Sequence, residues 1–429
     1  MSVALLLALQ VAAGDSIPAV TLAEALERSA RLDPNYVAAL GRVETAEWGR
    51  RAALLTFIVP ALSVRADWTW SSQLQFVGVN EQGGFVTTKR PVSTQADARI
   101  DLFTGGQKLF GYRQADALLE AARAGELAAR FAAALQTESD YYAVIAEEEL
   151  TRTARERVAR AREQFEVARA RVRTGAAVQT DSLQLSLELT RASVALLREE
   201  SALRVARLQL GRRIGVEGPV GAVALDTALA PPLPFPFADA VRRALAQGPE
   251  YRQARATERG AQAALQVRRG AYLPRVSLGA QVSVLDSTFY PDLLSRRQLQ
   301  LTVSLPIWDN GSREIALTQA RTARDAARAL RADFERAAQR DVGAAYDAYE
   351  TARAATVLAA DAVVVTRENF RIQQTRYRSG ATTILDLLDA QVNLSDAEAG
   401  LVQARYATRL ALAALEAILG ERLFNRNLE

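Results

Sequence analysis

The chain contains no cysteine and no histidine among its 429 residues. Their absence excludes disulfide bonds, thiolate nucleophiles, zinc sites built on Cys or His ligands, and imidazole acid–base catalysis. Lysine occurs only at Lys89 and Lys108, and the formal net charge of +4 is spread over the whole length, which gives no basic patch for nucleic acid. No phosphate-binding Gly loop and no pairing of a nucleophile with a base is visible. The sequence therefore indicates no catalytic residue, no metal site and no cofactor, and an enzyme is not expected.

Long apolar runs are also missing. The apolar stretch Val3 to Ala13 precedes the small residue Gly14, and residues 1–14 are interpreted as a signal peptide. The alternative is a frayed apolar terminus, because no Lys or Arg lies near Met1. No later segment has about 18 uncharged apolar residues, which excludes a transmembrane helix. A membrane role would have to be carried by β-strands.

Two segments rich in Ala, Arg, Glu and Leu contain no proline and run from about 109 to 173 and from about 312 to 378. At 1.5 Å per residue, each predicts a helix of roughly 100 Å, far longer than an ordinary globular helix. After each comes a further helix, at about 180–214 and 383–419. The last helix has residues spaced in steps of three and four over three heptads, which predicts a coiled-coil seam. They are Leu385, Leu388, Val392, Ser395, Ala399, Val402 and Tyr406. The earlier helix has a similar row that begins Leu183, Leu187.

Two regions instead alternate apolar and polar residues with a period of two, at about 62–103 and 275–308. Each contains two runs of the length that crosses a bilayer as a tilted strand. The Gly- and Asn-rich sequence from Gly78 to Gly84 turns the chain between the first two runs. Four such strands cannot close a barrel by themselves, because the smallest barrels have about eight strands. Two further copies would give twelve strands, and one further copy eight.

The chain is internally duplicated. Gly175 and Gly380 lie 205 residues apart (380 − 175), and the same offset relates Gly106 to Gly311. The expected organisation is a first structural repeat over 20–215, a linker over 216–236, a second repeat over 237–420 and a C-terminal tail over 421–429. Because the helical part is locked in length while the first hairpin is about nine residues longer, the helix ends are expected to meet fixed partners.

Several motifs follow this duplicated plan in order. They are Leu-Asp-Pro34 and Gly-Pro249, Leu-Pro274, Leu-Phe-Thr-Gly-Gly106 with Ile-Trp-Asp-Asn-Gly311, and Arg-Tyr-Arg-Ser-Gly380 followed by Leu-Asp-Leu-Leu-Asp-Ala-Gln391. Each motif is weak alone, but together they resemble the TolC family of outer-membrane efflux proteins over the whole chain after the signal.

The resemblance implies a mainly α fold with a membrane β-barrel. Long coiled-coil helices would form an α-barrel through the periplasm, and four strands per subunit would complete a trimeric 12-stranded barrel in outer-membrane lipid. The linker and tail would lie in an equatorial belt. The implied function is the exit duct of a tripartite efflux or type I secretion system, which works with a periplasmic adaptor (membrane fusion) protein and an inner-membrane pump. The alternative, from another class, is a soluble periplasmic coiled-coil scaffold or adaptor protein.

The resemblance also implies a gate at the periplasmic tips. Asp386 and Asp389 match the paired aspartates of the family's constriction, while Asp181 and Tyr377 match two positions of the network that holds the tips closed. A third position of that network, an Arg in the family, is Thr382 here, and Arg376 or Arg378 is considered as its substitute. Crowded carboxylates in a ring are expected to raise one another's pKa. Without the resemblance, two Asp at a helix start simply favour the helix dipole.

Two further groups of residues are assigned roles. The turns Thr174-Gly175-Ala176 and Ser379-Gly380-Ala381 resemble the docking points of the adaptor, although glycine also serves as an ordinary helix C-cap. Aromatic residues near the strand ends are candidate anchors at the membrane interface, with ordinary packing as the alternative. These residues are Trp68, Trp70, Phe103 and Trp308, with Phe289 and Tyr290 in the second hairpin.

Overall fold

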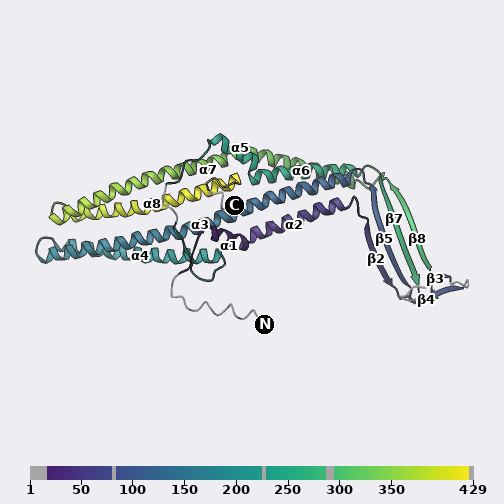
Figure 1. Cartoon of the computed structure of the whole chain (residues 1–429), viewed down its shortest axis with the longest axis horizontal. Coiled ribbons are helices and arrows are strands. Elements are labelled where there is room, and N and C mark those ends of the chain that lie inside the picture. Colours follow the sequence, from purple (N-terminus) through teal and green to yellow (C-terminus); the bar gives the residue numbers. More distant parts are fainter. Residues whose placement is uncertain (1–16, 80–83, 225–228, 287–293, 425–429) are drawn as a thin grey trace. The chain divides into compact units, whose positions relative to one another are not determined.

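The computed structural model describes residues 17–79, 84–224, 229–286 and 294–424 (Figure 1). The predicted signal peptide, Phe289 and Tyr290 lie outside these residues. The elements in chain order are β1 (Ala19–Val20), α1 (Leu22–Leu32), α2 (Pro34–Leu55), β2 (Ala61–Trp68), β3 (Gln75–Val79), β4 (Phe85–Thr88), β5 (Val92–Phe103), α3 (Gln107–Arg173), α4 (Gln179–Arg213), β6 (Gly221–Ala222), α5 (Phe237–Gln247), α6 (Pro249–Gly270), β7 (Arg275–Asp286), β8 (Leu294–Ser304), α7 (Ser312–Ser379) and α8 (Ile384–Leu419).

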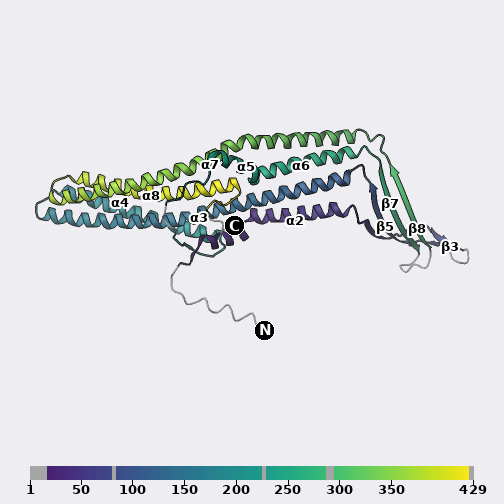
Figure 2. The same ribbon diagram turned by 45° about the horizontal axis from the view of Figure 1, so that its top comes forward.

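The two long helices are present at nearly the predicted bounds. Helix α3 has 67 residues and α7 has 68, and each is followed by its shorter antiparallel partner, α4 or α8 (Figures 1 and 2). Glycines spaced by 205 residues adopt the same left-handed backbone in both repeats, with φ of 82° and 80° at Gly106 and Gly311. A residue with a Cβ would be strained at these positions. The duplication seen in the sequence is therefore a duplication of backbone geometry.

The chain divides into two compact units, which are described separately. One unit comprises Met1–Leu40, Gly125–Glu250 and Arg336–Glu429, and the other comprises Gly41–Ala124 and Tyr251–Glu335. The first unit holds the helical hairpins α3–α4 and α7–α8 together with α1 and α5. The second unit holds the β-sheet and the helix segments that lead into it.

The sheet of the second unit is antiparallel, with strand order β2-β5-β7-β8. Its register aligns polar residues on one face, as in the row Ser63, Asp97, Gln281, Gln298. The neighbouring row, Leu62, Ala98, Ala280, Leu299, is apolar and lies on the other face. Leu62 and Leu299 are 74% and 73% exposed. The predicted alternation is therefore realised, and β2 and β8 are the two edges of the sheet.

The first hairpin differs from the expectation in one respect. The segment read as a Gly- and Asn-rich turn carries a second small hairpin, β3–β4, within the described residues. The rings of Phe76 and Phe85 meet edge to face at 5.7 Å between their centroids. Such a cross-strand aromatic pair stabilises a short hairpin. The sequence analysis missed it because Gly78 interrupts the alternation, and the pairing indeed shifts register between Phe76 and Gly78.

In the first unit, buried tyrosines tie irregular segments to the long helices. The Tyr141 hydroxyl contacts the carbonyls of Val20 (3.2 Å) and Val223 (2.8 Å), so that α3 holds the small parallel pair β1–β6 in place. In the second repeat, Tyr349 on α7 donates in the same way to the carbonyl of Pro231, at 2.5 Å. The described parts of the linker are therefore anchored by the helices through its carbonyl groups.

The seam predicted on α8 is buried only in part. Ser395 and Val402 are buried and Leu388 packs against the apolar core near the tips, but Leu385 and Val392 are exposed, and the chain buries Leu387, Gln391 and Leu394 instead. On α4 the leucines of the predicted row are exposed, and Leu185, Ala192 and Leu203 are buried. Both helices carry apolar residues on more than one face, so heptad spacing alone could not say which face meets the chain's own core. No helix in the described ranges combines the length and apolar character needed to span a membrane.

Candidate functional site: the tips of the two helical hairpins

Each helical hairpin turns through the same hydrogen-bonded motif. At the first tip, the amide of Gly175 donates to the carbonyl of Val172 (3.1 Å) and that of Ala176 to Arg171 (2.8 Å). At the second tip, the amides of the Gly and Ala 205 residues later repeat both bonds, at 3.1 and 2.7 Å. This is the Schellman pattern, which needs a left-handed residue, and Gly175 and Gly380 have φ of 73° and 79°. All six residues proposed for adaptor docking are exposed.

The two tips share one apolar core. Leu185 from α4 packs with Phe370 and Tyr377 from α7 and with Leu387 and Leu394 from α8. Leu185 and Leu387 are fully buried. Because the cluster draws residues from both hairpins, the two tips of one chain are held together as one structural element.

The predicted gate residues Tyr377 and Asp181 are brought together. The Tyr377 hydroxyl donates to a carboxylate oxygen of Asp181 at 3.5 Å, which is a long hydrogen bond. Burial raises the pKa of Tyr377 above its ordinary value, and the negative charge of Asp181 raises it further. The bond links α7 to α4, and therefore the second hairpin to the first.

Two arginines add further links between the hairpins: Arg171, which the sequence analysis did not name, and Arg378, one of the two substitutes it considered for the family's Arg. The guanidinium of Arg171 on α3 donates to the carbonyls of Tyr377 and of Ala176, the latter at 3.2 Å, and lies 5.1 Å from the centre of the Tyr377 ring. Arg378 on α7 forms an ion pair with Glu163 on α3. Arg376, by contrast, donates within its own hairpin. The signal for these roles was present in the sequence, because Arg-x-Arg precedes each tip glycine.

The predicted constriction aspartates differ in their surroundings. Asp386 accepts hydrogen bonds from the hydroxyls of Thr382 (2.8 Å) and Thr383 (2.7 Å) and from the Thr383 amide (3.1 Å), which forms a capping box at the start of α8. The Thr383 hydroxyl in particular lowers the pKa of Asp386 below its ordinary value. The direction is opposite to the one expected for a crowded ring, because within one chain hydrogen-bond donors surround this carboxylate. Asp389 is exposed one turn later.

A small cavity of about 340 Å³ lies between the tips. Its walls include Arg171, Asp181, Tyr377, Thr382 and Thr383, so the side chains that link the hairpins also line it. Thr382, at the position where the resemblance implies an Arg, also lines this cavity but donates a hydrogen bond to Asp386 on its own hairpin.

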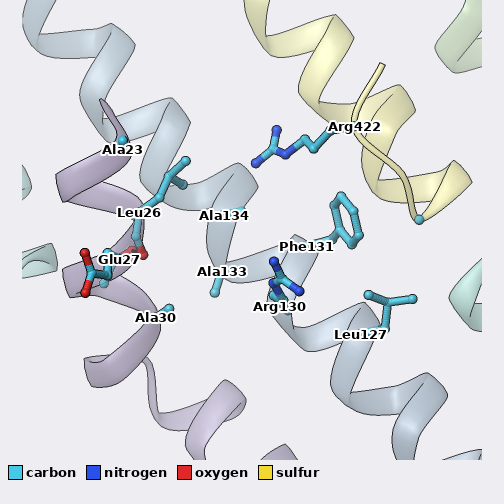
Figure 3. Close-up of a pocket in the computed structure, with 12 residues that line it drawn as sticks. Ala23, Leu26, Glu27, Ala30, Leu127, Arg130, Phe131, Ala133, Ala134 and Arg422 are labelled. Carbon is cyan, nitrogen blue, oxygen red and sulfur yellow. Dashed lines mark hydrogen bonds between the residues drawn. The ribbon is translucent and has the colours of Figure 1, made fainter. Parts of the chain in front are cut away.

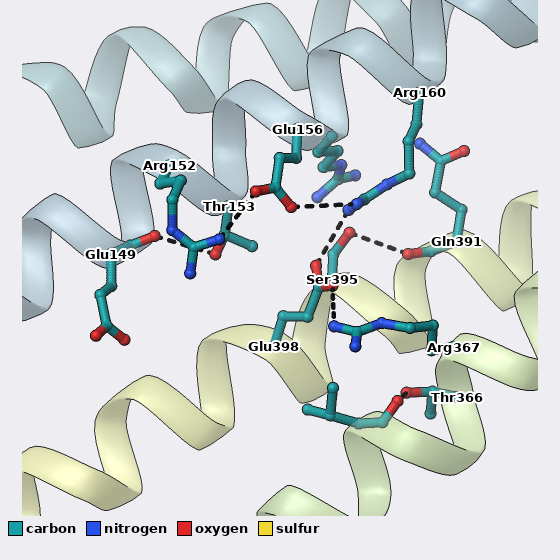
Figure 4. A network of polar contacts seen from close by, with 12 residues as sticks. Glu149, Arg152, Thr153, Glu156, Arg160, Thr366, Arg367, Gln391, Ser395 and Glu398 are labelled. Carbon is teal, nitrogen blue, oxygen red and sulfur yellow. Dashed lines mark hydrogen bonds and ion pairs between the residues drawn. The ribbon is translucent and has the colours of Figure 1, made fainter. Parts of the chain in front are cut away.

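Behind the tips, ion pairs join three helices (Figure 4). Glu398 on α8 accepts from Arg160 on α3 at 3.1 Å and from Arg367 on α7 at 3.3 Å, and its side chain is only 10% exposed. The side-chain amides of Gln391 and Gln164 are buried and have no hydrogen-bond partner among the described residues. This layer is polar although it is enclosed, so it orients the helices more than it stabilises them.

A second cavity, of about 600 Å³, lies between α1, α3 and the C-terminal segment (Figure 3). Arg422 reaches across it and forms ion pairs with Glu138 at 2.6 Å and Glu416 at 2.7 Å, with all three side chains almost fully buried. Burial is the main cause that raises the pKa of Glu138, and Arg422 opposes it. Among the described residues, no group of three or more His, Cys, Asp or Glu side chains could hold a metal ion.

The candidate interface aromatics lie near both ends of the sheet. Trp68 ends β2 and Trp70 follows it, while Phe103 ends β5 and Trp308 follows β8. All four are exposed, from 48% for Phe103 to 74% for Trp308. Strand β5 has 12 residues, so its ends are separated by roughly 36 Å along the strand at about 3.3 Å per residue.

Long paired helical hairpins with linked tips, joined to antiparallel strands with one apolar face, define the class of outer-membrane export channels. The chain belongs to the outer membrane efflux protein family, whose model matches residues 33–216 and 240–421. The protein is therefore an outer-membrane efflux protein and not an enzyme.

Among similar proteins is CyaE from Bordetella pertussis (strain Tohama I), 31% identical over 185 residues, which are 42% of this chain and 39% of that protein. The match thus spans about two fifths of that relative. Among solved structures, CusC has a TM-score of 0.79 at 17% identity, with 93% of this chain and 92% of that chain covered. The open state of MtrE from Neisseria gonorrhoeae has a TM-score of 0.75 at 19% identity, with 94% and 89% covered. These likenesses show that the fold extends over nearly the whole chain.

Proposed function

We propose that three copies of this chain form a channel-tunnel, the exit duct of a tripartite efflux or type I secretion system. The observation that carries the proposal is the four-stranded sheet, whose edges β2 and β8 are unpaired in the described chain. An open edge in lipid leaves backbone groups unsatisfied, at several kcal/mol each. Because β2 and β8 run antiparallel across the sheet, β8 of one copy can pair with β2 of the next. Three sheets of four strands would then close a 12-stranded barrel.

The helices support the same assembly. Helix α4 exposes Leu183, Leu187 and Leu197, at 63%, 49% and 65%, and α7 exposes Leu358 and Val365, at 69% and 68%. Apolar rows of this length rarely stay in water on a soluble monomer. Packing α4 of one copy against α7 of the next would cover both rows. The seam predicted on α4, which is exposed in the single chain, would then be buried between copies.

The tips would form the gate of this duct. The contacts of Tyr377 with Asp181 and of Arg171 with Tyr377 hold the two hairpins of one copy together, which favours a closed end. Three copies would bring Asp386 and Asp389 around one axis, as a ring of six carboxylates. Such a ring attracts cations and repels anions.

Three partners are part of the proposal: a periplasmic adaptor, an inner-membrane pump and outer-membrane lipid. The exposed turns at Thr174–Ala176 and Ser379–Ala381 are the proposed docking points of a periplasmic adaptor. Energy would come from an inner-membrane pump, because the sequence has no nucleotide-binding motif. The four aromatic residues at the sheet ends would lie at the two interfaces of outer-membrane lipid.

Planar-bilayer recording of the purified protein tests the proposal. We expect small currents that prefer cations. Changing Asp389 to Ala removes a carboxylate without touching the capping box and should reduce the cation preference. Changing Asp386 to Ala as well should also raise the conductance, because the start of α8 loosens. Asp396→Ala, on the exposed side of the same helix, is the control and should leave both unchanged. A verified, membrane-inserted trimer that carries no current would overturn the duct.

A further inference from the structure

The ion pair that links the two tips has a second copy in the sequence. Arg378 on α7 pairs with Glu163 on α3. Subtracting the repeat offset of 205 from Arg378 gives Arg173, and adding it to Glu163 gives Glu368. Both residue types are therefore repeated, although most ion-pairing positions of the tips are not.

Within the chain the second pair is not made. Arg173 is exposed at the end of α3 and has no ion pair within the described residues. Among the residues that the structure describes, Glu368 pairs only with Arg371, one turn along the same helix, at 2.6 Å. Glu368 lies three and ten residues after Val365 and Leu358, so it shares the face of α7 that carries the exposed apolar row.

We infer that Arg173 of one copy pairs with Glu368 of the neighbouring copy. The inference rests on the proposed trimer. In a ring built from alternating repeats, every first repeat meets a second repeat twice, once in its own chain and once in the next copy. The contact between Arg378 and Glu163 belongs to the boundary within the chain. The boundary between copies has the same geometry with the repeats exchanged, and the residues that then face each other are Arg173 and Glu368.

Two other ion pairs that join α3 to α8 within the chain are not repeated. The counterparts of Arg160 and Glu398 are Val365 and Ser193, and those of Glu149 and Arg405 are Ala354 and Glu200. Of these three ion pairs, only the one between Arg378 and Glu163 has charged counterparts of opposite sign at both positions. An exposed pair at this place contributes little to the packing of the ring and can break while the helices stay together.

Cross-linking tests the contact directly, because the natural chain has no cysteine. The double variant Arg173→Cys with Glu368→Cys, treated with a short bifunctional maleimide, should give covalent dimers and trimers. The matched control, Glu163→Cys with Arg378→Cys, should cross-link within one chain and stay a monomer on a denaturing gel. Each variant with a single Cys should give no covalent trimer on the denaturing gel.

Charge reversal supplies a second readout. Arg173→Glu and Glu368→Arg should each raise the open probability, by about 1.5- to 5-fold for each link broken. Combining the two changes should return it towards the natural value. If light scattering shows trimers, the control pair reacts and the Arg173–Glu368 pair gives no ladder, the inference is overturned while the duct remains. If no trimer forms at all, the proposed function fails and the inference fails with it.

Discussion

Replacing Arg171 by Ala tests whether the two tips of a copy are held by this one side chain. The change removes two charge-assisted hydrogen bonds to carbonyl oxygens and the cation–π contact with Tyr377. A hydrogen bond to a charged donor contributes about 1.5–3 kcal/mol when buried, and an exposed cation–π contact about 0.5–1 kcal/mol. Because Arg171 is only half-buried, water can replace part of the hydrogen bonding that the substitution removes. We expect a net loss of about 1–2 kcal/mol in the free energy that keeps the tips together.

The assay is hydrogen exchange of the turn amides, followed by mass spectrometry of peptides that cover residues 174–178 and 379–383. A loss of that size should speed the local opening of both turns by about 5- to 30-fold, since about 1.4 kcal/mol is a factor of ten. Arg169→Ala is the control, because in the described part of the chain Arg169 pairs only with Glu166 on its own helix. Equal exchange in the two variants, or a change confined to the first turn, would refute the reasoning.

Three further predictions concern the same tips. Thr383→Ala should raise the pKa of Asp386 back towards the ordinary value of an aspartate. In the natural chain the carboxylate stabilises the start of α8 above that ordinary pKa and ceases to do so as the pH falls through its lowered pKa, which pH-dependent exchange of the α8 amides would follow. Leu387→Ala should lower the free energy of unfolding by about 2–5 kcal/mol, and Leu385→Ala by less than half as much, because of the two only Leu387 is fully buried; the shift in melting temperature measures both. Gly380→Ala should destabilise the second turn by about 1 kcal/mol and weaken adaptor binding in a pull-down, since its φ is 79°.

The sequence predicted the helical and strand elements well, because each rests on a local signal. Proline-free stretches gave α3 and α7 at nearly their observed bounds, and a period of two gave all four strands of the main sheet. The glycines at a spacing of 205 residues gave the duplication, since only a residue without a Cβ takes the left-handed turn freely. These features need no knowledge of what packs against them.

The parts that failed depend on tertiary neighbours. The predicted seam of α8 includes Leu385 and Val392, which are exposed, while the chain buries Leu387 and Leu394, which the seam left out. Heptad spacing does not choose between two apolar faces when one meets the same chain and the other is free for a second copy. In the same way, the role of Arg171 depends on the carbonyl of a residue 206 positions away, which no local pattern contains.

The two halves of the chain are unequal at their tips, and this inequality sets the order in which the gate should open. Within a copy, the link includes the Tyr377 ring, its hydroxyl and the shared apolar core. Between copies, the position of Tyr377 is taken by Val172, which has neither ring nor hydroxyl, so the hydroxyl bond and the cation–π contact have no counterpart there. The weaker boundary should part first, so opening should separate one copy's tips from those of the next while each copy's own two tips stay together. Maleimide cross-links between copies should therefore suppress the current, whereas cross-links within a copy should leave most of it. The opposite ranking would show that the contact between Tyr377 and Asp181 is the one that opens.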